Sequence, residues 1–219
     1  MSFDLLAPHY QWLEKIVFGQ RLQDARIAFI RQVSSARRVL VIGEGDGRFL
    51  AEFVKSYPRA EIDCLDASPR MLALVRKRTL GRPIRFINAS LEKAELSRNC
   101  YDLLVTHFFF DCFGEKTLPK VIEKLEGAAA VEAEWLIAEF QQPFHGWRGL
   151  AGRWLINFMY FFFQLFAGIE ARRLIDYRPL LRAHGFNLVN GQGSPNEMIR
   201  SELWRRVPSS GSSFPAGKT

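Results

Sequence analysis

The most informative stretch of this sequence is Val39-Leu-Val-Ile-Gly-Glu-Gly-Asp-Gly47. Its first four residues form an unbroken apolar run rich in β-branched side chains, which is typical of a strand covered on both faces of a parallel sheet. Three glycines follow at alternate positions, and an apolar helical pattern begins after them at Phe49. Glycine permits positive φ angles and lets a ligand approach the backbone closely. The stretch therefore predicts a strand, a ligand-binding loop and a helix.

Further strands and helices alternate along the chain after this unit. Strands are expected at 62–65, 84–87, 101–106, 135–140, 186–189 and 198–207, and helices at 71–78, 115–125 and 178–183. Ser68 and Pro69 are residues favoured at a helix N-cap and at the first helical position. A short turn rich in Gly, Pro and Asn joins the last two strands and predicts an antiparallel hairpin. The pattern predicts an α/β fold with a mostly parallel, Rossmann-like sheet between helices.

We interpret residues 1–208 as one domain, because 219 residues with 48% apolar content are ordinary for a single globular unit. Residues 1–36 carry an apolar helical period that breaks at Gly19 and predict N-terminal helices. Residues 141–176 form an aromatic insertion after the fifth strand, which we expect to be a helical lid. Residues 209–219 have the composition of a flexible tail.

Charge and cysteine content exclude several classes of function. The net charge is +7, but the basic residues are spread along the chain without alternating with aromatic residues, which favours a solvated, mildly cationic surface over a nucleic-acid partner. The three cysteines, Cys64, Cys100 and Cys112, are odd in number and lack CxxC spacing, so we expect neither a disulfide framework nor a metal site. The N-terminus lacks the pattern of a signal peptide, and we therefore expect a cytoplasmic protein.

The glycine loop and an acid after the second strand indicate the ligand. The G-x-G-x-G spacing differs from the dinucleotide fingerprint, because Arg48 occupies the place of its last glycine. Glu44 and Asp46 add negative charges that would repel a pyrophosphate but tolerate an ammonium group. Asp66 ends the second strand, where a carboxylate can accept hydrogen bonds from both ribose hydroxyls, and Ser68 already provides the helix cap. We therefore expect a cationic nucleoside ligand and disfavour an NAD-dependent oxidoreductase.

Four stretches of the chain resemble the class I S-adenosylmethionine-dependent methyltransferases. They are residues 39–47, Leu65-Asp-Ala-Ser-Pro-Arg-Met71, Tyr101-Asp-Leu-Leu-Val-Thr-His-Phe108 and Leu180-Leu-Arg-Ala-His-Gly-Phe186. The resemblance extends over residues 37–207 and implies seven strands in the order 3-2-1-4-5-7-6, with strand 7 antiparallel. It also implies S-adenosyl-L-methionine as the cofactor, S-adenosyl-L-homocysteine as the product, and methyl transfer by in-line displacement.

The resemblance further implies which residues bind the cofactor. They are Gly43, Glu44, Gly45, Asp46 and Gly47 in the loop, Asp66, Ala67 and Met71 after the second strand, Ala89 and Ser90 after the third, and Thr106 and His107 at the end of the fourth. The glycines would line the methionine part and Glu44 would face its ammonium group. Asp66 would bind the ribose, and Ser90 stands where the family often has an Asp that binds the adenine amino group. Thr106 and His107 would lie beneath the sulfonium.

The acceptor is expected to be a small hydrophobic or aromatic molecule, methylated at O, N or C. Residues 3–10 resemble the start of the ubiquinone and menaquinone C-methyltransferases, which implies that Tyr10 points into the site; the alternative is a helix-packing role. A base is needed only when the nucleophile holds its proton tightly. The candidate proton acceptors are His107, Asp111 and His145, each of which also has a structural interpretation. Residues 108–113 depart from the pattern of the quinone enzymes, which weakens a quinone assignment. Two alternatives stay open: a small hydrophobic or aromatic acceptor in general, or, more narrowly, a lipid or quinone-like acceptor.

The aromatic insertion leaves three interpretations open: a buried lid, a hydrophobic acceptor pocket, or a surface for a membrane interface or a dimer. Ten aromatic residues lie in the stretch from Phe140 to Phe166, both included, and the apolar stretch 154–169 is shorter than the roughly 20 residues that span a bilayer. Flanking arginines would suit peripheral contact with anionic lipids. An alternative function is a catalytically silent cofactor-binding subunit that uses this insertion to bind a partner.

Overall fold

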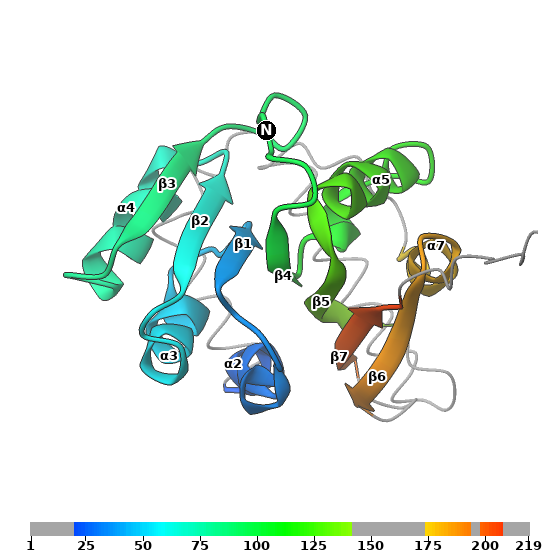
Figure 1. Cartoon of the computed structure of the whole chain (residues 1–219), viewed down its shortest axis with the longest axis horizontal. Coiled ribbons are helices and arrows are strands. Elements are labelled where there is room, and N and C mark those ends of the chain that lie inside the picture. Colours follow the sequence, from blue (N-terminus) through cyan, green and yellow to red (C-terminus); the bar gives the residue numbers. More distant parts are fainter. Residues whose placement is uncertain (1–19, 142–173, 194–197, 208–219) are drawn as a thin grey trace, which may run out of the picture.

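The computed structural model describes residues 20–141, 174–193 and 198–207. Its strands are β1 (Arg38–Ile42), β2 (Glu61–Asp66), β3 (Ile84–Asn88), β4 (Tyr101–His107), β5 (Ala129–Phe140), β6 (Phe186–Gln192) and β7 (Ile199–Arg206). They form one sheet in the order β3-β2-β1-β4-β5-β7-β6 (Figure 1). Strands β1 to β5 pair in parallel, and β7 is antiparallel to both β5 and β6. The predicted sheet order and the terminal hairpin are confirmed.

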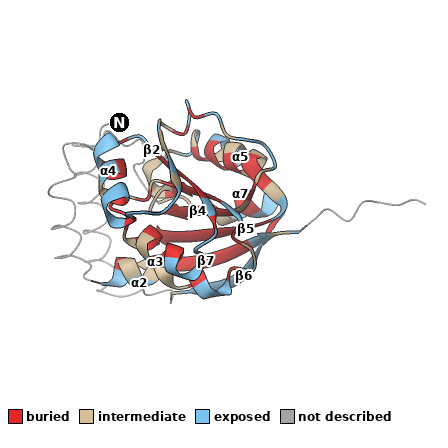
Figure 2. Cartoon of the chain, turned by 60° about the vertical axis from the view of Figure 1, so that its left-hand side comes forward, coloured by how far each residue is buried: buried red, intermediate tan, exposed pale blue. Residues whose placement is uncertain are grey.

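Helices cover both faces of this sheet. They are α2 (Arg21–Ile27), α3 (Arg48–Ser56), α4 (Pro69–Arg78), α5 (Leu118–Ala128) and α7 (Arg178–Ala183), with 3-10 turns η2 (Ile30–Gln32) and η3 (Phe110–Cys112). One core layer joins α3 and α4 to the sheet through residues such as Phe49, Phe53 and Val75. The other joins α5 and α7 through Trp135 and Trp204. Figure 2 shows the central strands buried between these two layers.

The chain before β1 is less helical than its apolar period predicts. Within the described part of residues 1–36, α2 ends at Ile27 and only the short turn η2 follows. The segment after η2 is drawn into an extended path, because Ser34 N donates to the Glu134 carboxylate and Ser35 Oγ donates to Asp102. Residues 1–19 lie outside the described residues. The prediction of a helix beyond Ile27 was therefore wrong apart from η2.

Strand β5 begins at Ala129, six residues before the predicted start at Trp135. Its first half, Ala-Ala-Val-Glu-Ala-Glu, consists largely of good helix formers, so its composition does not indicate a strand. Pairing with β4 overrides this preference, with Tyr101 opposite Ala129 and a register shift before Leu103 meets Glu134. Helix α5 spans Leu118–Ala128 instead of 115–125, and it has its proline in the first turn, as expected.

The predicted lid at 141–176 and the tail at 209–219 lie outside the described residues, except for residues 141 and 174–176. The single-domain assignment therefore stays a prediction. A search for membrane spans among the described helices found none with the length and apolar character to cross a bilayer.

Candidate functional site

The glycine loop connects the carboxyl end of β1 to the first turn of α3. Gly43, Gly45 and Gly47 have φ angles of +64°, +74° and +86°, which residues with a Cβ rarely adopt. Gly43 N donates to the Leu65 carbonyl oxygen at 2.9 Å, which ties the loop to the end of β2. The alternating glycines in the sequence therefore mark backbone conformations that the turn requires.

The three glycines have different surroundings. A Cβ on Gly47 would lie 2.8 Å from the Val75 Cα, so this glycine lets α3 and α4 pack closely. A Cβ on Gly43 would lie 3.0 Å from the ring of Phe109. At Gly45 nothing lies within 4 Å of the added atom. The backbone at Gly45 thus borders open space that a ligand can fill, and this cradle fits the methionine part of S-adenosylmethionine.

The two acids of the loop are held inside the protein. The Glu44 carboxylate accepts a hydrogen bond from Leu50 N at 3.0 Å, in the first turn of α3. Asp46 forms ion pairs with Arg48 Nε at 3.0 Å and with Arg78 Nη2 at 3.1 Å. This corrects the expectation that both acids contribute uncompensated charge to the loop, because arginines from α3 and α4 balance Asp46. Arg48, which stands where the dinucleotide fingerprint has its last glycine, is one of these two arginines.

Glu44 gives the protein a pH dependence of known sign. Burial raises the pKa of Glu44 from 4.5 to about 8, although the Leu50 N–H and the Arg26 charge act to lower it. A carboxyl with a raised folded-state pKa binds its proton more tightly in the folded protein than in the unfolded chain. The contribution of protonated Glu44 to the free energy of unfolding is therefore fully present at low pH and is lost as the pH rises from about 4.5 to about 8.

We therefore predict that Glu44→Gln reduces the fall in melting temperature between about pH 5 and about pH 8, since each pKa unit corresponds to about 1.4 kcal/mol. Thermal unfolding at several pH values measures this slope. Glu52→Gln, which removes an exposed acid of α3, is the matched control and should leave the slope unchanged. Equal slopes for the wild type and Glu44→Gln would contradict the burial of a protonated Glu44.

The ends of β2 and β3 bring together the residues predicted to bind ribose and adenine. Asp66 Oδ1 accepts from Ser68 N at 2.8 Å, and the Asp66 carbonyl accepts from Ala89 N at 3.2 Å. Ala67 is exposed and Met71 is buried in the first turn of α4. Ser68 accepts a hydrogen bond from the backbone N–H of that turn, which confirms the predicted cap. The structure thus places Asp66 and Ala89 together at the adjoining ends of β2 and β3, next to the Leu65 carbonyl that Gly43 of the glycine loop contacts. Ala67 and Ser90 follow them in the chain.

Thr106 and His107 end β4, but their side chains point to opposite faces of the sheet. Thr106 Oγ1 accepts from Trp135 Nε1 at 2.9 Å on the α5 side. The His107 ring meets Phe49 of α3 edge-on, with 4.6 Å between ring centroids. Burial, and then the charge of Arg26, lower the pKa of His107 well below its ordinary value. Burial thus favours the neutral imidazole of His107, and its role as a proton acceptor stays a prediction.

A buried acid that the sequence analysis missed lies at the end of β5. Glu139 is 3% exposed, and its Oε1 accepts from Phe109 N at 2.9 Å and from Phe110 N at 2.8 Å. These bonds hold the turn after β4, in which Phe108 adopts the left-handed φ of +53°. Such a conformation costs about 1–2 kcal/mol in a residue with a Cβ. The signal in the sequence that could have identified Glu139 is that it is the one acid in the otherwise apolar run 135–140.

Asp111 lies in the same turn as these two amides. Burial raises the pKa of Asp111 to about 6, against the lowering by the Cys112 thiol. Burial and then the Asp111 charge raise the pKa of Glu139 well above its usual range. The predicted acid Asp111 and the unpredicted acid Glu139 thus form one interacting pair, which we call the acid pair.

Two predicted site residues, Tyr10 and His145, lie outside the described residues, so their roles stay predictions.

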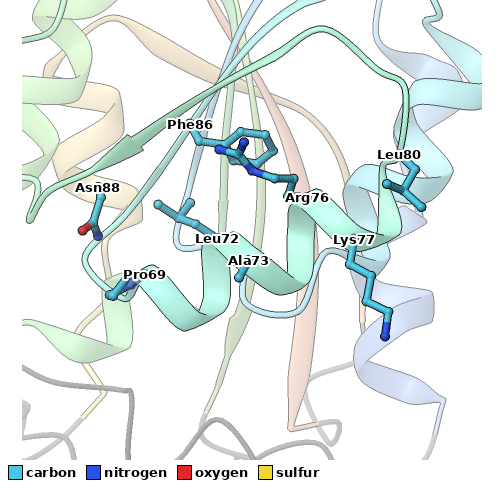
Figure 3. Close-up of a pocket in the computed structure, with 8 residues that line it drawn as sticks. All are labelled: Pro69, Leu72, Ala73, Arg76, Lys77, Leu80, Phe86 and Asn88. Carbon is cyan, nitrogen blue, oxygen red and sulfur yellow. The ribbon is translucent and has the colours of Figure 1, made fainter.

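Within the described ranges, no group of three or more His, Cys, Asp and Glu side chains could hold a metal ion. A surface pocket of about 520 Å³ lies between α4 and the edge strand β3 (Figure 3). Arg76 and Phe86 stack in it, and none of its lining residues is a predicted cofactor ligand.

Comparisons with known proteins also indicate a methyltransferase. Residues 39–129 match a family described as "Methyltransferase domain". The malonyl-[acyl-carrier protein] O-methyltransferase of Halalkalibacterium halodurans is 34% identical over 37% of this chain and 31% of its own length. The demethylmenaquinone methyltransferase of Thermus thermophilus is 27% identical over 69% of this chain and 70% of its own.

Solved structures share the fold at low sequence identity. The magnesium protoporphyrin IX methyltransferase of Synechocystis, solved with bound S-adenosylhomocysteine, has a TM-score of 0.61 and 15% identity, over 86% of this chain and 83% of its own. The chain spans only 31% to 50% of the length of the malonyl-[acyl-carrier protein] O-methyltransferases that it matches. The comparisons therefore identify a methyltransferase domain in a chain with the fold of the class I S-adenosylmethionine-dependent methyltransferases.

Proposed function

We propose that this protein transfers a methyl group from S-adenosylmethionine to a small hydrophobic or aromatic acceptor. The observation that carries this proposal is the open backbone at Gly45, in a loop that Gly43 ties to Leu65, the residue before Asp66, at the adjoining ends of β1 and β2. Strand ends next to the point where the strand order reverses are the usual place for a nucleotide ligand in open α/β sheets. The family to which residues 39–129 belong uses this cofactor.

The cofactor supplies an activated methyl group on a positively charged sulfur. The protein therefore has to bind and orient the cofactor and the acceptor, and to exclude water. The glycine loop would hold the methionine part, and the Asp66 carboxylate would accept hydrogen bonds from the ribose hydroxyls. Phe109 lies against Gly43 and stacks edge-on with Phe113 at 5.0 Å. These rings would form an apolar wall beside the transferred group and keep water away from it.

A quinone-like ring is the acceptor that we favour. The demethylmenaquinone relative is matched over most of both chains, whereas the malonyl relatives are matched over half of their length or less. Aromatic side chains also gather where the acceptor would enter, since Phe108 packs on Phe140 with 4.8 Å between ring centroids. Acceptors of this class partition into membranes, so we also propose a cytoplasmic protein in peripheral contact with a membrane surface.

The acceptor class is tested with methyl-labelled S-adenosylmethionine and two probes. We expect label to enter 1,4-naphthoquinol, a soluble quinone-like ring, and not malonyl-coenzyme A. Label in the malonyl ester alone would move the proposal to carboxyl methylation. A folded protein that binds the cofactor but labels neither probe would contradict the proposed acceptor.

A further inference from the structure

We propose that the acid pair, Asp111 and Glu139, is the polar recognition point for the acceptor and that it selects a neutral hydrogen-bond donor, such as a ring hydroxyl, over a carboxylate. This inference rests on the proposed methyltransferase function and names the acceptor's chemical class. It is carried by a buried carboxyl oxygen at the end of β5 that has no hydrogen-bond partner among the described residues.

The two oxygens of Glu139 have different surroundings. Oε1 accepts from two backbone N–H groups, those of Phe109 and Phe110. Oε2 is also buried, but it has no hydrogen-bond partner in the part of the chain that the structure describes. A buried carboxyl oxygen without a partner costs free energy comparable to a lost hydrogen bond, so a group that pairs with it on binding would gain that free energy. A ligand hydroxyl would satisfy it.

Asp111 makes the site selective for charge. Its carboxylate interacts electrostatically with Glu139, and the Cys112 Sγ lies 3.5 Å from Asp111 Oδ1. The Cys112 thiol and the Tyr177 hydroxyl also face Glu139, and both stay neutral because burial raises the pKa of each. Glu139 is buried and Asp111 is half-buried beside it, so both carboxyls cannot ionise at low cost. We therefore assign one proton and one negative charge to the pair at neutral pH.

A site with this charge accepts some ligands and rejects others. A neutral hydroxyl can donate to the ionised carboxylate, whereas a ligand carboxylate would add a third acid to a buried site. When the acceptor forms its new bond to the methyl group, the bond between methyl and sulfur breaks and its electron pair stays on sulfur. The hydroxyl proton of the acceptor then moves to the ionised carboxylate of the pair, so charge and atoms balance.

The test uses dead-end binding, in which no transfer occurs. Calorimetry at about pH 7.5 compares 1-naphthol with 1-naphthoate on protein saturated with S-adenosylhomocysteine. We expect naphthol to bind at least about tenfold more tightly, a difference of about 1.4 kcal/mol. In Asp111→Asn, and in the double variant that combines it with Glu139→Gln, we expect the affinities for naphthol and naphthoate to differ by no more than about threefold. The main reason is that naphthoate should bind more tightly.

Glu134→Gln is the matched control, because Glu134 is a buried acid in the middle of β5, away from Glu139, that pairs with Arg205. It should leave the ratio of the two affinities unchanged. Naphthoate binding as tight as naphthol, no binding of either probe, or an unchanged ratio in Asp111→Asn would each overturn the inference. Failure of S-adenosylhomocysteine to bind the wild type would instead overturn the proposed function, so the two failures are distinguishable.

Discussion

Asp66→Ala is expected to weaken S-adenosylhomocysteine binding by about 100-fold. A carboxylate that accepts from two ribose hydroxyls forms two charge-assisted hydrogen bonds, each contributing about 1.5–3 kcal/mol. Loss of both leaves the hydroxyls without partners in a partly enclosed site, and about 2.7 kcal/mol corresponds to 100-fold in affinity. Isothermal titration calorimetry of both proteins measures the effect.

The matched control is Glu61→Ala, at the opposite end of the same strand. Glu61 is exposed and lies 3.7 Å from Arg38 at the amino end of β2, away from the glycine loop. It should bind S-adenosylhomocysteine as the wild type does. Melting temperatures of both variants check that folding is intact, since Asp66 also accepts from Ser68 N. Unchanged affinity in a folded Asp66→Ala protein would contradict the ribose assignment.

Alanine at Gly47 is expected to have the largest effect on stability, of about 2–5 kcal/mol. The new Cβ would lie 2.8 Å from the Val75 Cα, so α3 and α4 would have to separate. Overpacking of this kind costs about 1–3 kcal/mol, and the left-handed φ at this position adds about 1–2 kcal/mol. Denaturant unfolding measures the loss.

Alanine at Gly45 is the comparison, because its Cβ would meet open space. Only the φ penalty of about 1–2 kcal/mol applies to the folded protein. The methyl group would, however, occupy the cradle that we assign to the cofactor. We therefore expect Gly45→Ala to lose at least about tenfold in S-adenosylhomocysteine affinity while staying folded. A Gly47 variant as stable as the Gly45 variant would contradict the close packing of α3 on α4.

Local patterns in the sequence were sufficient to predict much of the fold. The apolar run at 39–42 becomes the fully buried part of β1, and the three glycines all adopt positive φ. Ser68 caps α4, and Gly185 stops α7 with a φ of +81°. Each of these features depends on residues close together in the chain, so composition and spacing carry the information.

Features that depend on distant residues were not predictable in this way. Asp46 pairs with Arg78, 32 positions later, and this pairing reverses its expected role as a free loop charge. Glu139 acquires its importance from the amides of a turn 30 positions earlier. The start of β5 is set by pairing with Tyr101 and not by its own composition. Tertiary contacts decide all three, and a single sequence does not show them.

The central claim is that the glycine loop and Asp66 bind S-adenosylmethionine. Calorimetric titration of the wild-type protein with S-adenosylhomocysteine, and separately with NAD, tests it most directly. We predict binding of S-adenosylhomocysteine at one site and no heat of binding with NAD, because the loop lacks the dinucleotide spacing. A folded protein that binds NAD, or that binds neither ligand, would contradict the account.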